Sequence, residues 1–217
     1  HPTPVVGMVG LVHDLAYVRG LAWRQAGDAI WLLGVPLDEG ETPADPRLGL
    51  AGSSYLERMH GAVTGRPPVI DLQLERAVQA FLRQAIAADL VCSAHDLSDG
   101  GLAVAVAESC IAAGLGAHLV LPASAARLDR LLFAEGGARL LVSVAPEQSA
   151  AWQQALEREA QRGAPLPATP LGQVTASAEL WLEQAGTTLL RAEVAALQQA
   201  YEQAIPRRVA GAVPPTA

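Results

Sequence analysis

A short polar stretch in the middle of the chain holds residue types that could do chemistry. It reads His95, Asp96, Leu97, Ser98, Asp99, Gly100, Gly101. The apolar residues 88–91 before it predict a strand, and Leu102, Val106 and Cys110 after it recur at helical spacing. The two glycines allow close approach of the backbone, and the free N–H groups of a helix start favour an anion. The stretch therefore has the geometry of a strand–turn–helix binding site.

The carboxylates of this stretch have two alternative roles. Asp96 and Asp99 would repel a bare phosphate, so they either serve the turn as caps or meet phosphate through bound Mg²⁺. We favour the first role, in which Asp99 or Ser98 caps the following helix. A catalytic triad of His95, Asp96 and Ser98 is not expected, because adjacent side chains on a strand point to opposite faces.

The composition excludes several classes of function. The chain has 217 residues, of which 51% are hydrophobic and 17% charged, as in a globular protein. It contains no Lys, so a phosphate-binding loop of the Walker type is excluded. The net charge of −7 gives no basic footprint for nucleic acid, and we expect no nucleic-acid partner.

The cysteines and the apolar runs indicate a reducing, non-membrane setting. Cys92 and Cys110 have no metal or redox spacing and are interpreted as core residues kept reduced in the cytoplasm. No signal peptide is predicted, and no apolar run reaches the roughly 18 residues of a membrane span. The chain opens at His1, a few residues ahead of an apolar run, which indicates a piece of a longer polypeptide.

Helical and strand patterns alternate along the chain. Strands are predicted over residues 4–12, 28–34, 117–121 and 140–144, followed by a hairpin of 179–183 and 187–191. Helices are predicted over 53–61 (with Tyr55, Leu56 and Met59 inward), from Asp71 to 86, over 128–133 and 147–161, and from Val194 to a stop at Ile205-Pro206. His118, alone in an apolar strand, is interpreted as structural. The pattern predicts an α/β (α+β) layered domain.

Several blocks of sequence also occur in a recognisable order. They are residues 2–11, 27–34, 52–56, 67–68, 94–103, 107–110, 132–139 and 205–206. In series they resemble the C-terminal part of the phosphoribosylformylglycinamidine synthases, a family of purine-biosynthesis synthetases, from His1 to about Arg208.

The resemblance implies a fold and a division of the chain. Family members have two tandem halves, each with an ATP-binding N-type lobe and a C-type lobe. Residues 1–26 would be the last strand of the preceding N-type lobe with its linker, 27–206 the second C-type lobe, and 207–217 a flexible tail. The implied fold is a mixed sheet between helical layers, as in the C-terminal lobes of the aminoimidazole ribonucleotide synthetase-like superfamily.

The resemblance also implies an activity for the whole enzyme. It is an ATP-dependent carbon–nitrogen ligase that converts formylglycinamide ribonucleotide and ammonia from glutamine into the formylglycinamidine, with ATP and Mg²⁺ as cofactors. Its implied partners are the rest of its own chain, a glutaminase subunit and a small subunit. Catalytic and metal residues lie in other lobes, so none is assigned here. The ligand-facing candidates are His95, Asp96, Ser98, Asp99, Gly100, Gly101 and Glu135.

One departure from the family pattern bears on the role of this lobe. C-type lobes often carry Glu-Ser-Gln after a Leu-Phe step, whereas this chain has Glu135, Gly136 and Gly137. Two polar contact groups are therefore missing, which favours a structural, inactive fragment. The alternatives are a lobe of a related synthetase, of the aminoimidazole ribonucleotide or selenophosphate type, and a non-catalytic assembly or regulatory lobe.

Overall fold

A computed structural model describes residues 5–37, 45–162, 166–209 and 211. Its elements in chain order are η1 (Leu15–Tyr17), β1 (Ala29–Gly34), α1 (Ser54–His60), α2 (Leu72–Ala87), β2 (Ser93–Asp96), α3 (Gly101–Ala113), β3 (Gly116–Leu121), α4 (Leu128–Phe133), β4 (Arg139–Val144), η2 (Pro146–Gln148), α5 (Ser149–Gln161), β5 (Ala168–Thr175), β6 (Glu179–Gln184), β7 (Thr187–Glu193) and α6 (Val194–Val209).

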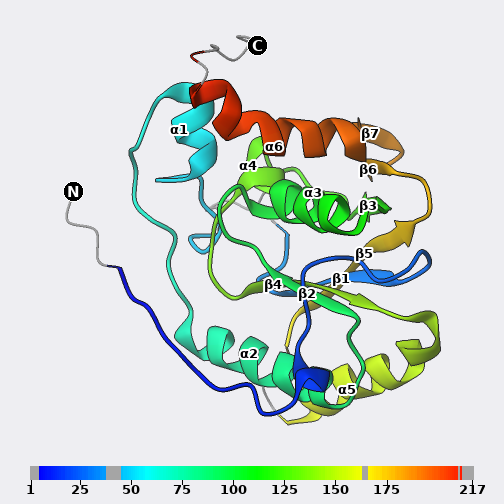
Figure 1. Ribbon diagram of the computed structural model, residues 1–217. Helices are drawn as coiled ribbons and strands as arrows, with labels where there is room; N and C mark the ends of the chain where they lie inside the picture. Colours follow the sequence, from blue (N-terminus) through cyan, green and yellow to red (C-terminus); the bar gives the residue numbers. More distant parts are fainter. Residues whose placement is uncertain (1–4, 38–44, 163–165, 210, 212–217) are drawn as a thin grey trace.

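The described strands form one seven-stranded mixed sheet in the order β2-β4-β1-β5-β3-β6-β7. Neighbouring strands are antiparallel except β3 and β6, which are parallel. Helices lie on both sides of this sheet, with α3, α4 and α6 on one side and α2 and α5 on the other (Figure 1). The predicted fold class, a mixed sheet between helical layers, is confirmed.

Strand alternation divides the core into two clusters. On β1, Ile30 and Leu32 point into the cluster under α3, whereas Leu33 belongs to the cluster under α2 and α5. On β4, Leu141 belongs to the first cluster and Val142 to the second. Removing these apolar side chains from water is the main force that holds both helical layers on the sheet.

The second cluster does not extend across the whole sheet. Its described residues include none from β3, β6 or β7. On that part of the sheet, the His118 ring stacks on Trp181, with centroids 4.1 Å apart, and the Arg191 guanidinium lies 5.3 Å from the same indole. The structural interpretation of His118 is therefore supported by a cross-strand stack.

The predicted helix ends are largely confirmed. The Asp71 carboxylate accepts hydrogen bonds from the Gln73 and Leu74 N–H groups at the start of α2, at 3.1 and 3.0 Å. The Ser53 hydroxyl caps α1, and Gly114 ends α3 in the left-handed conformation. The Asp71 and Ser53 side chains thus accept hydrogen bonds from N–H groups that have no partner within the helix.

Four local predictions were wrong. Residues 5–12 form no strand and are exposed, and the strand expected at 88–91 begins later, at Ser93. Met59, expected inward, is 60% exposed. Helix α6 continues through Pro206 to Val209, so residues 207–209 are helical and not tail. Pro206 lies in the last turn, where it removes one intrahelical hydrogen bond without ending the helix.

Asp28, which precedes β1, is an unusual member of the core. Its side chain is fully buried, and neither carboxylate oxygen makes a hydrogen bond of normal geometry, although Gln25 and Cys92 lie close enough to offset part of the cost of burial. Burial raises the pKa of the Asp28 carboxyl above its ordinary value. Relative to the unfolded chain, folding therefore favours the neutral form of this carboxyl, and ionisation as the pH rises weakens the fold.

We expect Asp28→Asn to remove this pH dependence. The folded-state pKa is raised, so the carboxyl favours folding below its unfolded pKa, and that contribution is lost as the pH rises through the folded pKa. Urea denaturation from pH 4 to pH 8 should show the Asn variant gaining stability over the wild type as the pH increases. Asp99→Asn, at an exposed carboxylate, is the control and should show no such trend. If the stability difference between Asp28→Asn and the wild type did not change with pH, the raised pKa of the Asp28 carboxyl would be contradicted.

Candidate functional site

The strand–turn–helix stretch is formed as predicted, with the turn at residues 97–100 between β2 and α3. Gly100 and Gly101 have φ values of +82° and +63°, a region that favours glycine. A Cβ atom on Gly101 would lie 2.7 Å from the Ala134 carbonyl oxygen. The backbone at Gly101 therefore approaches another part of the chain closely, as predicted. The segment that it approaches is the end of α4 and the residue after it.

The Glu135 carboxylate, rather than Asp99, serves the start of α3. The N-cap residue of α3 is Gly100, and the helix has no side-chain cap. Glu135 Oε1 accepts a hydrogen bond from the Gly100 N–H at 2.7 Å and another from the Ser54 N–H at 2.9 Å. One carboxylate oxygen therefore joins the starts of α3 and α1. The capping prediction for Asp99 was wrong because the acceptor comes from a loop distant in sequence.

His95 lies between two carboxylates. Its Nε2 atom is 2.9 Å from Glu108 Oε2, and its Nδ1 atom is 3.4 Å from Asp96 Oδ1. The Ser98 carbonyl accepts a hydrogen bond from the Gly101 N–H, and within the described residues no bond joins the Ser98 hydroxyl to His95. The geometry agrees with the expectation that these residues form no catalytic triad.

The loop after Glu135 is covered by another part of the chain. The Glu135 N–H donates to the Gly49 carbonyl at 3.2 Å. A Cβ atom on Gly136 would lie 2.2 Å from the Arg47 carbonyl oxygen, so a serine cannot replace this glycine without movement of the backbone. The departure from Glu-Ser-Gln therefore has a steric reason. The space that the serine side chain would need is occupied by the Arg47 carbonyl group.

Arg139, at the start of β4, was not among the predicted site residues. It is 3% exposed, its Nη1 donates to the Ala134 carbonyl at 3.2 Å, and its Nε has no partner. Burial lowers its pKa to about 10, so it is still charged at neutral pH. In sequence it resembles an ordinary basic residue flanking a strand, and only the fold shows that its guanidinium is buried.

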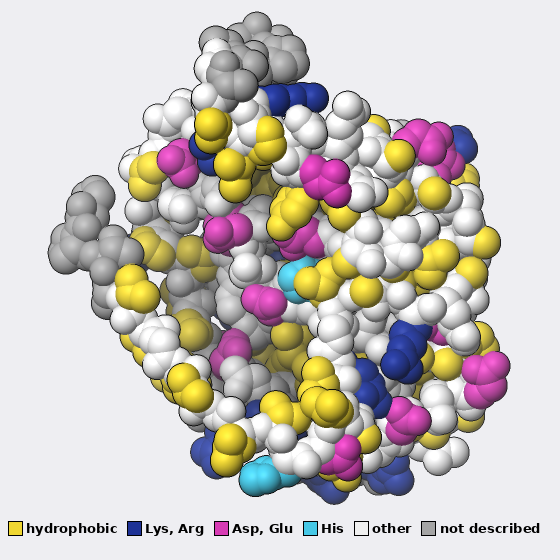
Figure 2. Space-filling model, in the orientation of Figure 1, with side chains coloured by type: hydrophobic (Ala, Val, Ile, Leu, Met, Phe, Trp, Pro, Cys, Tyr) yellow, Lys and Arg dark blue, Asp and Glu magenta, His cyan; other side chains and the backbone are white. Residues whose placement is uncertain are grey.

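The surface around the candidates is acidic. Figure 2 shows Asp and Glu side chains spread over the middle of the visible face, with few Lys or Arg side chains among them. Among the residues that the structure describes, no three His, Cys, Asp or Glu side chains are grouped so that they could hold a metal ion.

The sheet order and the turn packed on the loop after α4 define a mixed α/β lobe. The chain belongs to the family described as "AIR synthase related protein, C-terminal domain", whose model matches residues 25–183.

Curated relatives agree with this membership. The chain is 63% identical over 211 residues to the "Phosphoribosylformylglycinamidine synthase subunit PurL" of Prochlorococcus marinus strain MIT 9303, covering 96% of this chain and 26% of that protein. It is 54% identical over 209 residues to the protein of the same name in Synechococcus sp. strain WH7803, covering 96% and 27%. The chain thus spans about a quarter of the length of these relatives.

Solved structures share the fold at low sequence identity. The chain is similar to Thermotoga maritima PurL complexed with FGAR, with a TM-score of 0.66 and 16% identity, over 84% of this chain and 29% of that one. It is also similar to the hydrogenase maturation protein HypE in complex with ATP, with a TM-score of 0.51 and 16% identity, over 81% and 53%.

We expect Glu135→Ala to destabilise the chain by about 1–3 kcal/mol, because it leaves two helix-start N–H groups without their acceptor. Glu135→Gln keeps an acceptor oxygen but loses the charge, so it should recover part of this loss. Asp99→Ala, in the same turn, should cost less than about 0.5 kcal/mol. Chemical denaturation of the three variants measures these differences. Equal losses for Glu135→Ala and Asp99→Ala would restore the capping role of Asp99.

Proposed function

We propose that this chain is the C-terminal lobe of a phosphoribosylformylglycinamidine synthase of purine biosynthesis. The observation that carries the proposal is 63% identity to a named subunit of this synthase over 96% of the chain. In the proposed reaction, ATP activates the amide oxygen of formylglycinamide ribonucleotide and ammonia displaces the phosphate. ATP and Mg²⁺ would be bound by other lobes, and the setting would be the cytoplasm.

Within that enzyme, the lobe has a structural role in our proposal. Glu135 accepts hydrogen bonds from two helix starts, and the Arg47 carbonyl group lies against Gly136. These contacts leave the loop little freedom to bind a substrate. The ligand-facing candidates His95, Asp96, Ser98 and Asp99 would then border a neighbouring lobe. A purely assembly-type lobe, the second candidate function, is favoured by the same two contacts.

The partners in the proposal are the rest of the synthase chain, a glutaminase subunit and a small subunit. Similarity to a solved structure described as "Structure of PurLQS from Thermotoga maritima" supports a multi-component assembly for such proteins. No nucleic acid or membrane is expected to take part. None of the helices in the described part of the chain is long and apolar enough to cross a membrane.

The segment at the start of the described chain supports a contact with a neighbouring lobe. Val5, Met8 and Val9 are 93%, 93% and 104% exposed, a poor arrangement for apolar side chains in water. By contrast, Trp23 is 4% exposed in the core, and the Gly20 carbonyl accepts a hydrogen bond from Ala94 N–H on β2. Residues 1–26 were predicted to belong to the preceding lobe and its linker. We propose that the part of the chain that belongs to that lobe ends before Gly20.

A chimera tests the proposed function. The matching region of the Prochlorococcus marinus MIT 9303 relative is replaced by this chain, and ATP- and ammonia-dependent amidine formation is measured. We expect turnover within about tenfold of the parent enzyme, and none from the isolated chain, because the proposal places the catalytic groups elsewhere. A folded but inactive chimera, or turnover by the isolated chain, would overturn the proposal.

Deletion of residues 1–12 tests the proposed contact. If this segment is covered by a neighbouring lobe in the whole protein, the isolated chain should self-associate in light scattering, and the deletion should give a monomer of unchanged unfolding temperature. Loss of the folded state on deletion would show that the segment stabilises this lobe itself.

A further inference from the structure

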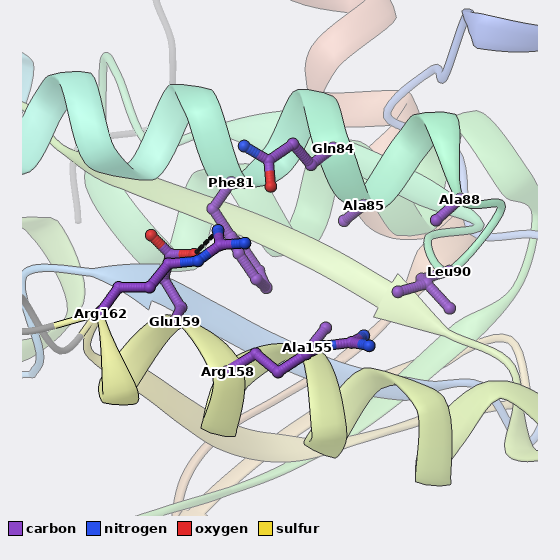
Figure 3. A pocket seen from close by; sticks show the side chains of 9 residues that line it. All are labelled: Phe81, Gln84, Ala85, Ala88, Leu90, Ala155, Arg158, Glu159 and Arg162. Carbon is purple, nitrogen blue, oxygen red and sulfur yellow. Dashed lines mark hydrogen bonds and ion pairs between the residues drawn. The ribbon is translucent and has the colours of Figure 1, made fainter.

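A cavity of about 250 Å³ lies between α2 and α5, on the far side of the lobe core from the α3 turn (Figure 3). Its apolar wall includes Phe81, Ala85 and Leu90, which are 4%, 3% and 7% exposed, together with Ala155 from α5. A hollow of this size exceeds the gaps that normal packing leaves between two helices.

Small residues keep the hollow open. Ala85 lines it from α2, Ala88 from the position just after α2, and Ala155 from α5, where longer apolar side chains would fill the space. Phe81 points from α2 toward α5 in Figure 3. Its ring is held edge-on against Trp152, with centroids 5.4 Å apart, which keeps it at the wall of the cavity.

Four polar side chains line this cavity: Gln84 from α2, Arg158 and Glu159 from α5, and Arg162 just after α5. In Figure 3 the Arg162 guanidinium lies between the two helices near Gln84, whereas the Arg158 side chain extends along α5 beside Ala155. Arg162 is paired with Glu159 at 2.9 Å, whereas no hydrogen bond or ion pair joins Arg158 to another described residue. Arg158 is exposed, so it places an unpaired positive charge at the solvent-facing edge of the apolar wall.

The position of Arg158 has a second explanation, because basic residues in the last turn of a helix stabilise the helix dipole. That role requires neither a cavity nor a second polar group. An apolar wall with the unpaired Arg158 guanidinium and the Gln84 amide at its edge has the kinds of groups that small-molecule sites combine, an apolar surface with a few polar groups.

We propose that the α2–α5 cavity binds a small organic anion with a planar apolar body. The body would lie against Phe81 and the alanine side chains, and its carboxylate or similar group would pair with Arg158. The volume suits one or two fused rings, since it lies below the range of sites for drug-sized ligands. This site is independent of the proposed synthase activity.

Two matched probes separate the apolar and ionic parts of the proposal. Naphthalene-2-carboxylate and its neutral carboxamide are titrated into the 217-residue chain by isothermal calorimetry. We expect saturable binding of one carboxylate per chain, about tenfold tighter than the carboxamide. Absence of saturable carboxylate binding, or equal affinity for both probes, would overturn the proposal.

Variants then place the binding. Arg158→Gln should weaken carboxylate binding about tenfold and leave the carboxamide unchanged, while Arg83→Gln, exposed on α2 outside the cavity, should change neither. Ala155→Leu should abolish binding of both probes by filling the hollow. Ala88→Leu, at the exposed end of α2, provides a second filling variant if Ala155→Leu is unstable. Undiminished binding in a folded filling variant would contradict the site.

Discussion

The Glu135 carboxylate is the contact on which the arrangement of this lobe depends. It accepts hydrogen bonds from N–H groups at the starts of α1 and α3, two helices that come from distant parts of the sequence. A negative charge at two helix N-termini is favoured both by the orphan N–H groups and by the helix dipoles. Because the same loop also bonds to Gly49, the turn after β2, the α1 start and the end of α4 are fixed relative to one another.

That contact changes how the family pattern is interpreted here. In the resemblance, the acidic residue of Glu-Ser-Gln belongs to a ligand-contact motif, whereas Glu135 is already occupied by the chain's own backbone. Gly136 then has to be small because the Arg47 carbonyl lies against it. The loop therefore keeps a glutamate that bonds to the chain's own backbone and has glycine where the motif has a polar residue. Both features fit the structural role that we propose for the lobe.

The elements that depend on local pattern could be predicted from the sequence. The apolar stripe after Asp71, the cap itself and the hairpin of β6 and β7 all follow from short-range spacing. The errors arose where contacts between residues that are distant in sequence determine the local structure. The acceptor at the start of α3 is Glu135 and not Asp99. Arg139 is buried, with its guanidinium bonded to the Ala134 carbonyl and its own carbonyl bonded to the Leu97 N–H. Residues 5–12 have the composition of a strand, yet no described strand pairs with them.

The sheet order has a consequence for how the chain acquires its fold. Strand β1 lies between β4 and β5, and its first partner is more than a hundred residues further along the chain. Closing so long a loop costs entropy before any strand pairing repays it, which slows folding. During synthesis, the apolar run Ile30, Trp31, Leu32, Leu33 would therefore leave the ribosome well before its neighbours and remain open to wrong association until β4 and β5 emerge.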